Sequence, residues 1–224
     1  MNKIITTLTA LLIFSSVYCQ KKKQVLKTSI DSFSYALGID YAKSLEEAKI
    51  NNVNFKIFEK AYTDVTEGNE TLIKEEDVKQ VINDYFVNLQ KIIEKENLEK
   101  GKSFLAENKN KEGIVELPSG LQYKIIKEGE GPKPALDDKV LCHYHGTLLD
   151  GTVFDSSVER GEPIEFPLKG VIKGWTEALQ LMNTGSKWIL YIPSDLAYGE
   201  RGAGGVIGPN ETLIFEVELI SISE

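Results

Sequence analysis

The sequence has little cysteine, histidine or methionine, with two of each among its 224 residues. Cys19 ends a leader-like segment, so Cys142 is the one cysteine left in the mature chain. This excludes an internal disulfide and leaves stability to the hydrophobic core. We expect Cys142 to be a small buried side chain in a strand. His143 and His145 lie two residues apart with no third ligand, so we interpret them as exposed strand residues and not as a metal site.

Long apolar runs and an excess of basic residues are also absent. No segment approaches the roughly 20 apolar residues that a membrane-spanning helix requires. The net charge is −8, and an acidic surface repels phosphate backbones, which argues against nucleic acid as a partner. The stretch GAGG lacks the lysine and the strand–loop–helix setting of a phosphate site, and no Ser, His and Asp constellation indicates a nucleophilic enzyme.

The segment 1–19 differs from the rest of the chain. Lys3 supplies a basic start, IITTLTALLIF a short apolar centre and SSVYC an end before the polar QKKKQ, which is typical of a secretory signal peptide. We therefore predict a secreted, periplasmic protein. The alternative is a lipoprotein anchored to the membrane through Cys19. Tyr18 disfavours it, because lipoprotein signals generally place a small residue before the cysteine.

Residues 20–112 carry three helical patterns. A first amphipathic helix can be capped by Ser32, and a second one starts after Asn54 and ends at Gly68. From Glu75 onward, apolar residues keep the helical spacing for roughly thirty residues, which is about 50 Å of helix.

This third helix is too long for two short helices of the same chain to cover. We expect part of its apolar stripe to contact another subunit, or the helix to serve as a stalk. The alternative is a break near Asn97 or Gly101. We therefore predict that 20–112 is a helical dimerisation or chaperone domain.

After residue 112 the period of the apolar pattern changes from 3.6 to 2. Residues that alternate with polar neighbours predict four strands, around Leu121, Tyr123 and Ile125, around Val140, Cys142 and Tyr144, around Trp188, Leu190 and Ile192, and around Leu213, Phe215, Val217 and Leu219. One helical segment, 174–182, is available to cover their apolar face. We therefore predict an α+β fold, with an N-terminal all-helical domain and, in 113–224, an antiparallel sheet wrapped on one short helix.

Three stretches of 113–224 resemble a known family. CHYHGTLLDGTVFDSS, GVIKGWTEALQLMNTG and LAYGERGAGGVIGPNETLIFEVELI are similar, in order and almost without gaps, to the FKBP-type peptidyl-prolyl cis–trans isomerases. The leader and the helical half resemble the secreted bacterial branch that includes the macrophage infectivity potentiators, whose N-terminal helices dimerise. The resemblance implies an FKBP-like fold, an isomerase without cofactor or metal that assists the folding of exported proteins, and a homodimer. It also implies unfolded proteins with X-Pro bonds as partners and a macrolide as inhibitor.

The implied reaction is rotation about the peptide bond before proline, where resonance raises a barrier of about 18–20 kcal/mol. The planar amide is the more dipolar state and water favours it. A dry apolar pocket should therefore lower the barrier without a nucleophile. Such a site needs aromatic walls and few polar groups.

The resemblance carries the family's pocket onto this sequence residue by residue. The catalytic candidates are Tyr144, Asp155 and Tyr198, and the substrate-binding candidates are Phe154, Phe166, Val171, Ile172, Trp175, Ile207 and Phe215. Trp175 would form the floor under the proline ring, between walls made by Tyr144, Phe154 and Phe215. The Ile172 N–H and the Tyr198 hydroxyl would bind substrate carbonyls. Asp155 would either polarise a carbonyl or hold Tyr144 and Arg160 by hydrogen bonds.

Other interpretations stay open. Taken singly, each of these aromatic residues could be core, and Asp155 could be an ordinary turn aspartate. A chain that kept the pocket only as core would be a non-catalytic chaperone or peptide-binding module. The sequence also departs from the family. Ile164 stands where many members have an aromatic, which predicts a thinner wall, and Ala203 and Gly208 replace a histidine and a proline, which predicts a more flexible loop.

Overall fold

The computed structural model describes residues 26–48, 50 and 52–223. The predicted signal peptide and Cys19 lie outside the described residues. Internal contacts divide the chain into two compact units, Met1–Leu72 and Ile73–Glu224. Within the described ranges, no helix combines the length and the apolar character needed to cross a membrane.

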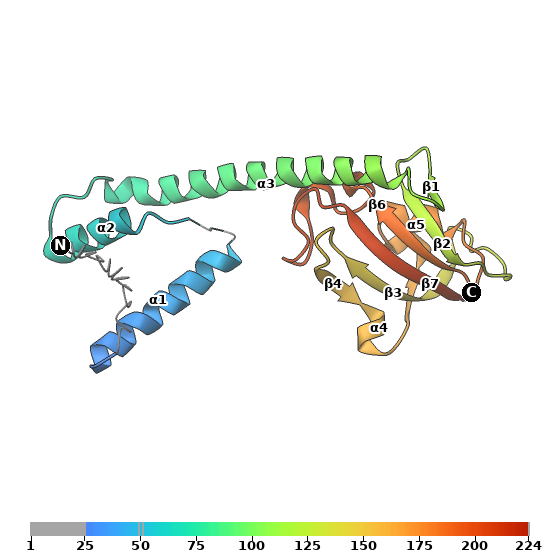
Figure 1. Ribbon diagram of the computed structural model, residues 1–224, viewed down its shortest axis with the longest axis horizontal. Coiled ribbons are helices and arrows are strands. Elements are labelled where there is room, and N and C mark those ends of the chain that lie inside the picture. Colours follow the sequence, from blue (N-terminus) through green and yellow to red (C-terminus); the bar gives the residue numbers. More distant parts are fainter. Residues whose placement is uncertain (1–25, 49, 51, 224) are drawn as a thin grey trace, which may run out of the picture. The chain divides into compact units, whose positions relative to one another are not determined.

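The first unit begins with α1 (Ser29–Glu47), and the predicted cap of this helix is wrong (Figure 1). Thr28 is the N-cap, because its hydroxyl accepts a hydrogen bond from the Asp31 N–H while the Asp31 carboxylate accepts one from the Thr28 N–H. Such a reciprocal capping box satisfies two N–H groups at once. Ser32 lies inside the helix and cannot do the same.

The second helix of this unit, α2 (Phe55–Glu67), has the predicted ends. The Asn54 side chain accepts a hydrogen bond from the Ile57 N–H, and Gly68 follows the helix with φ 73°. Glycine adopts this left-handed conformation without the steric cost of a Cβ atom.

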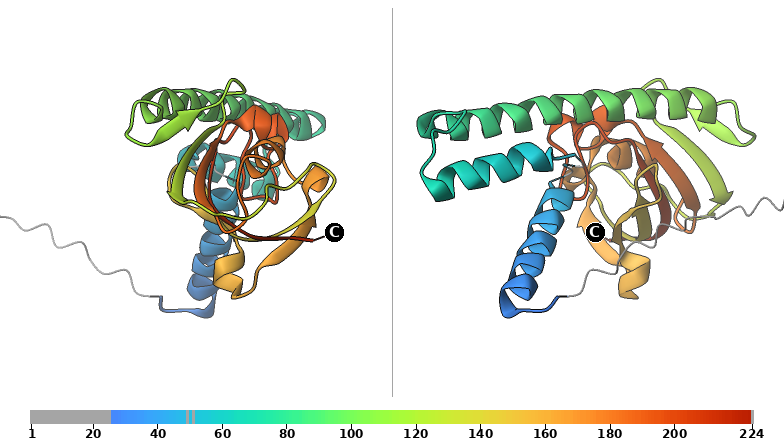
Figure 2. Two further views of the ribbon diagram at one scale, coloured as in Figure 1. Left: turned by 90° about the vertical axis from the view of Figure 1, so that its right-hand side faces the viewer. Right: turned by 60° about the vertical axis from the view of Figure 1, so that its left-hand side comes forward.

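In the second unit, the turn η1 (Glu75–Asp77) leads into α3 (Val78–Asn108), a single helix of 31 residues (Figure 2). The alternative of a break near Asn97 or Gly101 is wrong, because both residues lie inside the continuous helix. Asn97, Gly101 and Asn108 are its buried residues. Their spacing of four and seven places them on one face. The fully buried positions of this part of α3 are therefore small and polar residues, and apolar residues such as Phe104 are only partly buried beside them.

The rest of the second unit is an antiparallel sheet with the strand order β1-β2-β6-β7-β3-β4, in which β5 also pairs with β3 (Figure 1). The strands are β1 (Ile114–Glu116), β2 (Gln122–Lys127), β3 (Lys139–Thr147), β4 (Val153–Ser156), β5 (Ile164–Pro167), β6 (Lys187–Ile192) and β7 (Leu213–Ser223). β2, β3, β6 and β7 are the four predicted strands, so that prediction is confirmed. β1, β4 and β5 are too short to show a clear alternation.

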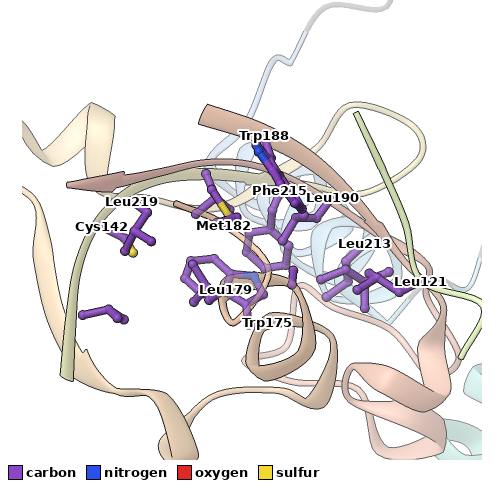
Figure 3. Packing of buried hydrophobic residues seen from close by; sticks show 14 of the residues in the cluster. Leu121, Cys142, Trp175, Leu179, Met182, Trp188, Leu190, Leu213, Phe215 and Leu219 are labelled. Carbon is purple, nitrogen blue, oxygen red and sulfur yellow. The ribbon is translucent and has the colours of Figure 1, made fainter. Parts of the chain in front are cut away.

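The helix α5 (Lys173–Leu179) covers the apolar face of the sheet, as predicted (Figure 3). Leu179 from the helix and Phe215 from β7 belong to the same buried cluster. A Cβ atom on Gly174 would lie 2.5 Å from Cγ2 of Ile192, so glycine allows the helix to approach β6 this closely.

Cys142 and the two histidines lie on β3. Cys142 is buried, as predicted, and burial raises the pKa of its thiol to about 12.

The prediction that His143 and His145 are exposed is wrong, because both are half-buried. Nδ1 of His143 lies 3.0 Å from Oγ of Ser157, and Nδ1 of His145 lies 2.9 Å from Oγ of Ser156. No cluster of three metal-binding side chains occurs in the part of the chain that the structure describes.

Buried polar groups at the C-terminal end of α3 form hydrogen bonds with the sheet. Nδ2 of Asn108 donates to Oε1 of Gln122 at 3.0 Å, and Nε2 of Gln122 donates to the Leu105 carbonyl at 2.8 Å. The ring of Phe104 packs against Tyr191, with 5.8 Å between centroids. The domain boundary at 112/113 stays a prediction, and α3 and the sheet share one compact unit.

Candidate active site

A cavity of about 590 Å³ opens in the second unit, between β3, β4, β5, α5, β7 and the loop after β6. Its volume lies in the range of small-ligand sites. Every site residue predicted from the sequence lines this cavity. Four further residues were not predicted and also line it, namely Gly170, Ala203, Gly204 and Val206.

Aromatic rings form the inner part of the cavity. Trp175 is only 4% exposed, and its ring centroid lies 5.3 Å from Tyr144, 5.1 Å from Phe215 and 5.3 Å from Phe166. Phe154 meets Phe215 at 5.2 Å. Tyr144, Phe154 and Phe215 make edge contacts, the geometry that aromatic pairs prefer over face-to-face stacking. The rings therefore hold one another in place around an apolar space.

Gly146 on β3 explains how two of these rings come together. A Cβ atom at this position would lie 2.6 Å from Cζ of Phe154 and 2.9 Å from Cε1 of Phe215. Only glycine leaves room for both rings. A glycine inside an alternating strand is a sequence signal for such a close approach, so Gly146 could have been found from the sequence as a residue that supports the site.

Ile172 begins α5 at the edge of the cavity. It is the N-cap residue, with φ −60° and ψ 151°, and no side chain caps the helix. Its carbonyl accepts a hydrogen bond from the Trp175 N–H at 3.0 Å. Among the described residues, no hydrogen bond from its own N–H is found. This N–H is therefore available to a ligand carbonyl.

Asp155 is the one charged residue of the lining, and it takes part in a hydrogen-bonded cluster. The Tyr144 hydroxyl donates to Oδ2 of Asp155 at 2.5 Å, and Arg160 donates to Oδ1 of Asp155 and, at 3.0 Å, to the Tyr144 hydroxyl. Burial alone would raise the pKa of Asp155, but the hydrogen bonds from Tyr144 and Arg160 outweigh it and hold this pKa below its usual value. The carboxylate is therefore charged and already paired at neutral pH.

The two tyrosines of the cavity remain protonated. Burial raises the pKa of Tyr144, and its hydrogen bond to Asp155 adds to the rise. Burial likewise raises the pKa of Tyr198, and the negative charge of Asp155 adds to it. Tyr198 is 41% exposed at the start of the glycine-rich loop. Its hydroxyl can therefore donate a hydrogen bond to a bound molecule.

Ile164 lies on β5 opposite Cys142 and does not line the cavity, so Phe166 is the residue of this strand that forms the wall. The thinner wall expected from Ile164 stays a prediction. Ala203, named from the sequence only as a departure, does line the cavity. The missed residues are small or lie next to predicted ones, such as Gly170 beside Val171, so side-chain chemistry gave no signal for them.

Comparisons with known proteins show the family of the chain. Residues 131–220 match the family described as FKBP-type peptidyl-prolyl cis-trans isomerase, and residues 30–125 match the domain amino terminal to FKBP-type peptidyl-prolyl isomerase. The chain is 44% identical to "Outer membrane protein MIP" of Legionella longbeachae, over 99% of this chain and 98% of that protein. It is 45% identical to "Peptidyl-prolyl cis-trans isomerase Mip" of Coxiella burnetii, over 89% of both chains.

A solved structure shows the same fold. The crystal structure of FkpA from Escherichia coli superposes with a TM-score of 0.72 at 31% identity, over 89% of this chain and 99% of that chain. This confirms the predicted α+β, FKBP-like fold. Since two relatives of 44% and 45% identity match over 89% or more of both chains and both family regions are present, the chain belongs to the FKBP-type peptidyl-prolyl cis–trans isomerases and catalyses rotation about the peptide bond before proline.

Proposed function

We propose that this isomerase speeds the proline-limited folding of exported proteins by holding the prolyl segment in the aromatic cavity. The main support for this proposal is the set of residues that line the cavity. These are aromatic and aliphatic except for the Asp155 carboxylate, which is already hydrogen-bonded to Tyr144 and Arg160. Such a lining removes water from the amide, and water favours the planar, more dipolar state. The barrier to rotation therefore falls without bond making or breaking.

In this proposal each polar group has a positioning task. Trp175 supports the proline ring, and the Ile172 N–H and the Tyr198 hydroxyl bind the substrate carbonyls on either side. Asp155 fixes Tyr144 and Arg160 and does not transfer a proton, because both of its oxygens already accept hydrogen bonds. The alternative in which Asp155 polarises a carbonyl would require one of these bonds to open.

A refolding assay tests the activity. The full mature chain is added to a protein whose refolding is limited by one X-Pro bond, and we expect faster refolding. The double variant Tyr198→Phe with Asp155→Val should lower kcat/KM by at least about 100-fold, the effect of losing one preorganised donor from a site. Tyr191→Phe is the matched control, because Tyr191 is half-buried on β6 outside the cavity. An unsubstituted chain without activity would overturn the proposal.

A chaperone function is the second candidate. It is favoured by large apolar side chains that are exposed on α1, α2 and the first half of α3, among them Phe33, Phe58, Tyr62 and Tyr85. Suppression of aggregation should then survive substitutions in the cavity. Loss of both functions in the double cavity variant would show that a separate chaperone surface is not needed.

We also propose that part of this exposed surface is covered by a second copy of the chain. Val81, Ile82, Tyr85 and Phe86 on α3 are each between 42% and 53% exposed, which is unusual for neighbouring apolar residues of a soluble helix. Light scattering should give the mass of a dimer. Tyr85→Glu combined with Phe86→Glu should shift it toward the monomer, whereas the off-stripe change Lys91→Glu should not. A monomeric unsubstituted chain at micromolar concentration would contradict this proposal.

For the location of the protein, we propose export through the leader and release into the periplasm. A relative bears the name "Outer membrane protein MIP", which keeps the lipoprotein alternative through Cys19 open to test. The intact mass of the mature N-terminus decides between them, because a lipidated Cys19 adds the mass of its acyl chains.

We further expect a macrolide inhibitor to bind in the aromatic cavity and to compete there with the peptide substrate.

A further inference from the structure

A glycine-rich loop between β6 and β7 forms one side of the cavity. Ala203, Gly204, Val206 and Ile207 of this loop line it. Its tip is closed by two hydrogen bonds, from the Ala203 N–H to the Ile207 carbonyl at 2.9 Å and from the Ile207 N–H to the Ala203 carbonyl at 3.0 Å. Gly204 and Gly205 between them have positive φ angles. Local bonds thus set the shape of the tip, but they do not fix where the tip lies relative to Trp175.

The base of the loop is fixed by α3, which carries no residue of the cavity lining. Nδ2 of Asn97 donates to the Pro209 carbonyl at 2.9 Å, and Nδ2 of Asn210 donates to the Glu94 carbonyl of the helix at 3.4 Å. The Asn210 N–H closes the base by donating to the Gly199 carbonyl at 2.8 Å. Pro209 is two residues from Ile207, so the contact with Asn97 lies two residues from the lining of the cavity.

Packing around this contact leaves little freedom. Asn97 is 9% exposed, and a Cβ atom on Gly208 would lie 3.3 Å from its Nδ2 atom. One helical turn further on, a Cβ atom on Gly101 would lie 2.2 Å from Oγ1 of Thr212, the residue before β7. The segment 208–212 therefore runs directly against one face of α3.

We propose that Asn97 is a positioning residue of the isomerase, which sets the distance between Ile207 and the aromatic floor by holding the Pro209 carbonyl. The wall made by Ile207 contacts the substrate in the ground state and in the transition state alike, so its displacement weakens binding of both. Loss of the Asn97 amide therefore acts mainly on KM. The long helix thereby becomes part of the substrate site although it contributes no lining residue.

The test compares two asparagines of the same helix in the full chain. Asn97→Ala removes the donor to Pro209, and Asn97→Asp removes it at nearly constant volume. Asn108→Ala is the matched control, because Asn108 is 1% exposed and bonds Gln122, which does not line the cavity. With a proline peptide as substrate, both Asn97 variants should raise KM about three- to tenfold with kcat within about twofold, as expected when one buried hydrogen bond no longer positions a binding wall. Asn108→Ala should lower stability and leave KM unchanged.

A second measurement does not depend on turnover. Amide hydrogen exchange of Ile207 should be faster in Asn97→Ala than in the unsubstituted chain and unchanged in Asn108→Ala. If Asn97→Ala fails to fold, Asn210→Gly replaces it, because glycine keeps the positive φ of 54° while losing the bond to Glu94. We expect a smaller change in the same direction.

The measurements distinguish failure of the Asn97 role from failure of substrate binding in the cavity. It rests on the proposed binding of the prolyl segment in the cavity, whose failure would appear as missing activity in the unsubstituted chain. Unchanged KM and unchanged Ile207 exchange in a folded Asn97 variant would overturn the role of Asn97 alone. An equal rise of KM in Asn108→Ala would also overturn it, because the effect would then come from general loosening of α3.

Discussion

Trp175 and Trp188 are both almost fully buried, at 4% and 3% exposure, and neither indole Nε1 has a hydrogen-bond partner among the described residues. They differ in surroundings. Trp175 lines the cavity, whereas Trp188 on β6 stacks on Tyr123 at 4.3 Å and lies outside it. A comparison of substitutions at the two tryptophans therefore distinguishes an effect on the hydrophobic core from an effect on the active site.

We expect Trp175→Leu to lower the free energy of unfolding by about 2–4 kcal/mol, as large-to-small changes in cores do, and to lower kcat/KM by at least about tenfold. Trp188→Leu should cost similar stability and leave kcat/KM within about twofold. Chemical unfolding and peptide isomerisation at a temperature where both variants are folded provide the two measurements. Equal loss of activity in both variants would mean that Trp175 acts only through the core.

Asp155 predicts a pH dependence of stability. Its pKa in the folded chain lies below the usual value because the hydrogen bonds from Tyr144 and Arg160 outweigh the effect of burial. A carboxyl of this kind stabilises the fold above its unfolded pKa of about 3.9, and the contribution is lost as the pH falls through the folded pKa. The side chain is 43% exposed, so solvent screening keeps the contribution below about 1 kcal/mol.

Asp155→Asn should therefore be less stable than the unsubstituted chain at pH 7, and the gap should shrink toward pH 2. Urea unfolding at several pH values measures it. Tyr144→Phe removes one of the hydrogen bonds to the carboxylate and should reduce the gap at neutral pH. A gap that stays constant over the whole range would show that the folded pKa of Asp155 is not lowered.

The sequence predicted which residues surround the cavity, and it predicted them through their order along the chain. Trp175 and Phe215 come from different elements, and neither periodicity nor composition distinguishes them from core residues. What the pattern could not supply is the pairing of Asp155 with Tyr144 and Arg160, which the resemblance left as one of two options. Such bonds depend on side-chain geometry across β3, β4 and α4 (Ser157–Arg160).

At the scale of elements, the sequence patterns located four helices (α1, α2, α3 and α5) and four strands. The contact that they did not predict is the one between α3 and the sheet. A search for apolar stripes does not locate it, because its fully buried helix residues are asparagine and glycine and Phe104 is only partly buried. Helix–sheet contacts that depend on hydrogen bonds to carbonyls, such as that of Gln122 with Leu105, leave no periodic signal in the sequence.

A substitution at Gly101 tests the close packing of α3 against the sheet. Glycine inside a helix is about 1 kcal/mol less favourable than alanine, so Gly101→Ala would stabilise an exposed helix. Here the new Cβ atom would lie 2.2 Å from Oγ1 of Thr212, which is 3% exposed. We expect Gly101→Ala to destabilise the chain by about 1–3 kcal/mol, as overpacking does, and Thr212→Ala to restore part of the loss. Stabilisation by Gly101→Ala in thermal unfolding would contradict the close approach.

At the scale of the whole molecule, composition and period separated a helical half from a sheet half, which led to a predicted boundary at 112/113. Internal contacts instead group α3 with the sheet from Ile73 onward. The two divisions describe different properties, because the change of period marks where secondary structure changes and the contacts mark what is packed together. The energetic boundary can be measured by cutting the chain at both places.

We expect the fragment 73–224 to be more stable than 113–224 by about 2–4 kcal/mol, because removal of α3 takes away its hydrogen bonds to Gln122 and Pro209 and exposes the apolar face of Tyr191 that Phe104 covers. Urea unfolding of both fragments gives the difference. Asn108→Ala in 73–224 should remove part of it, since that change breaks one of the same bonds. Equal stability of the two fragments would mean that the isomerase domain folds independently from residue 113 onward and that α3 contributes nothing to its stability. The expected difference would instead make the second half of α3 an integral element of the catalytic unit.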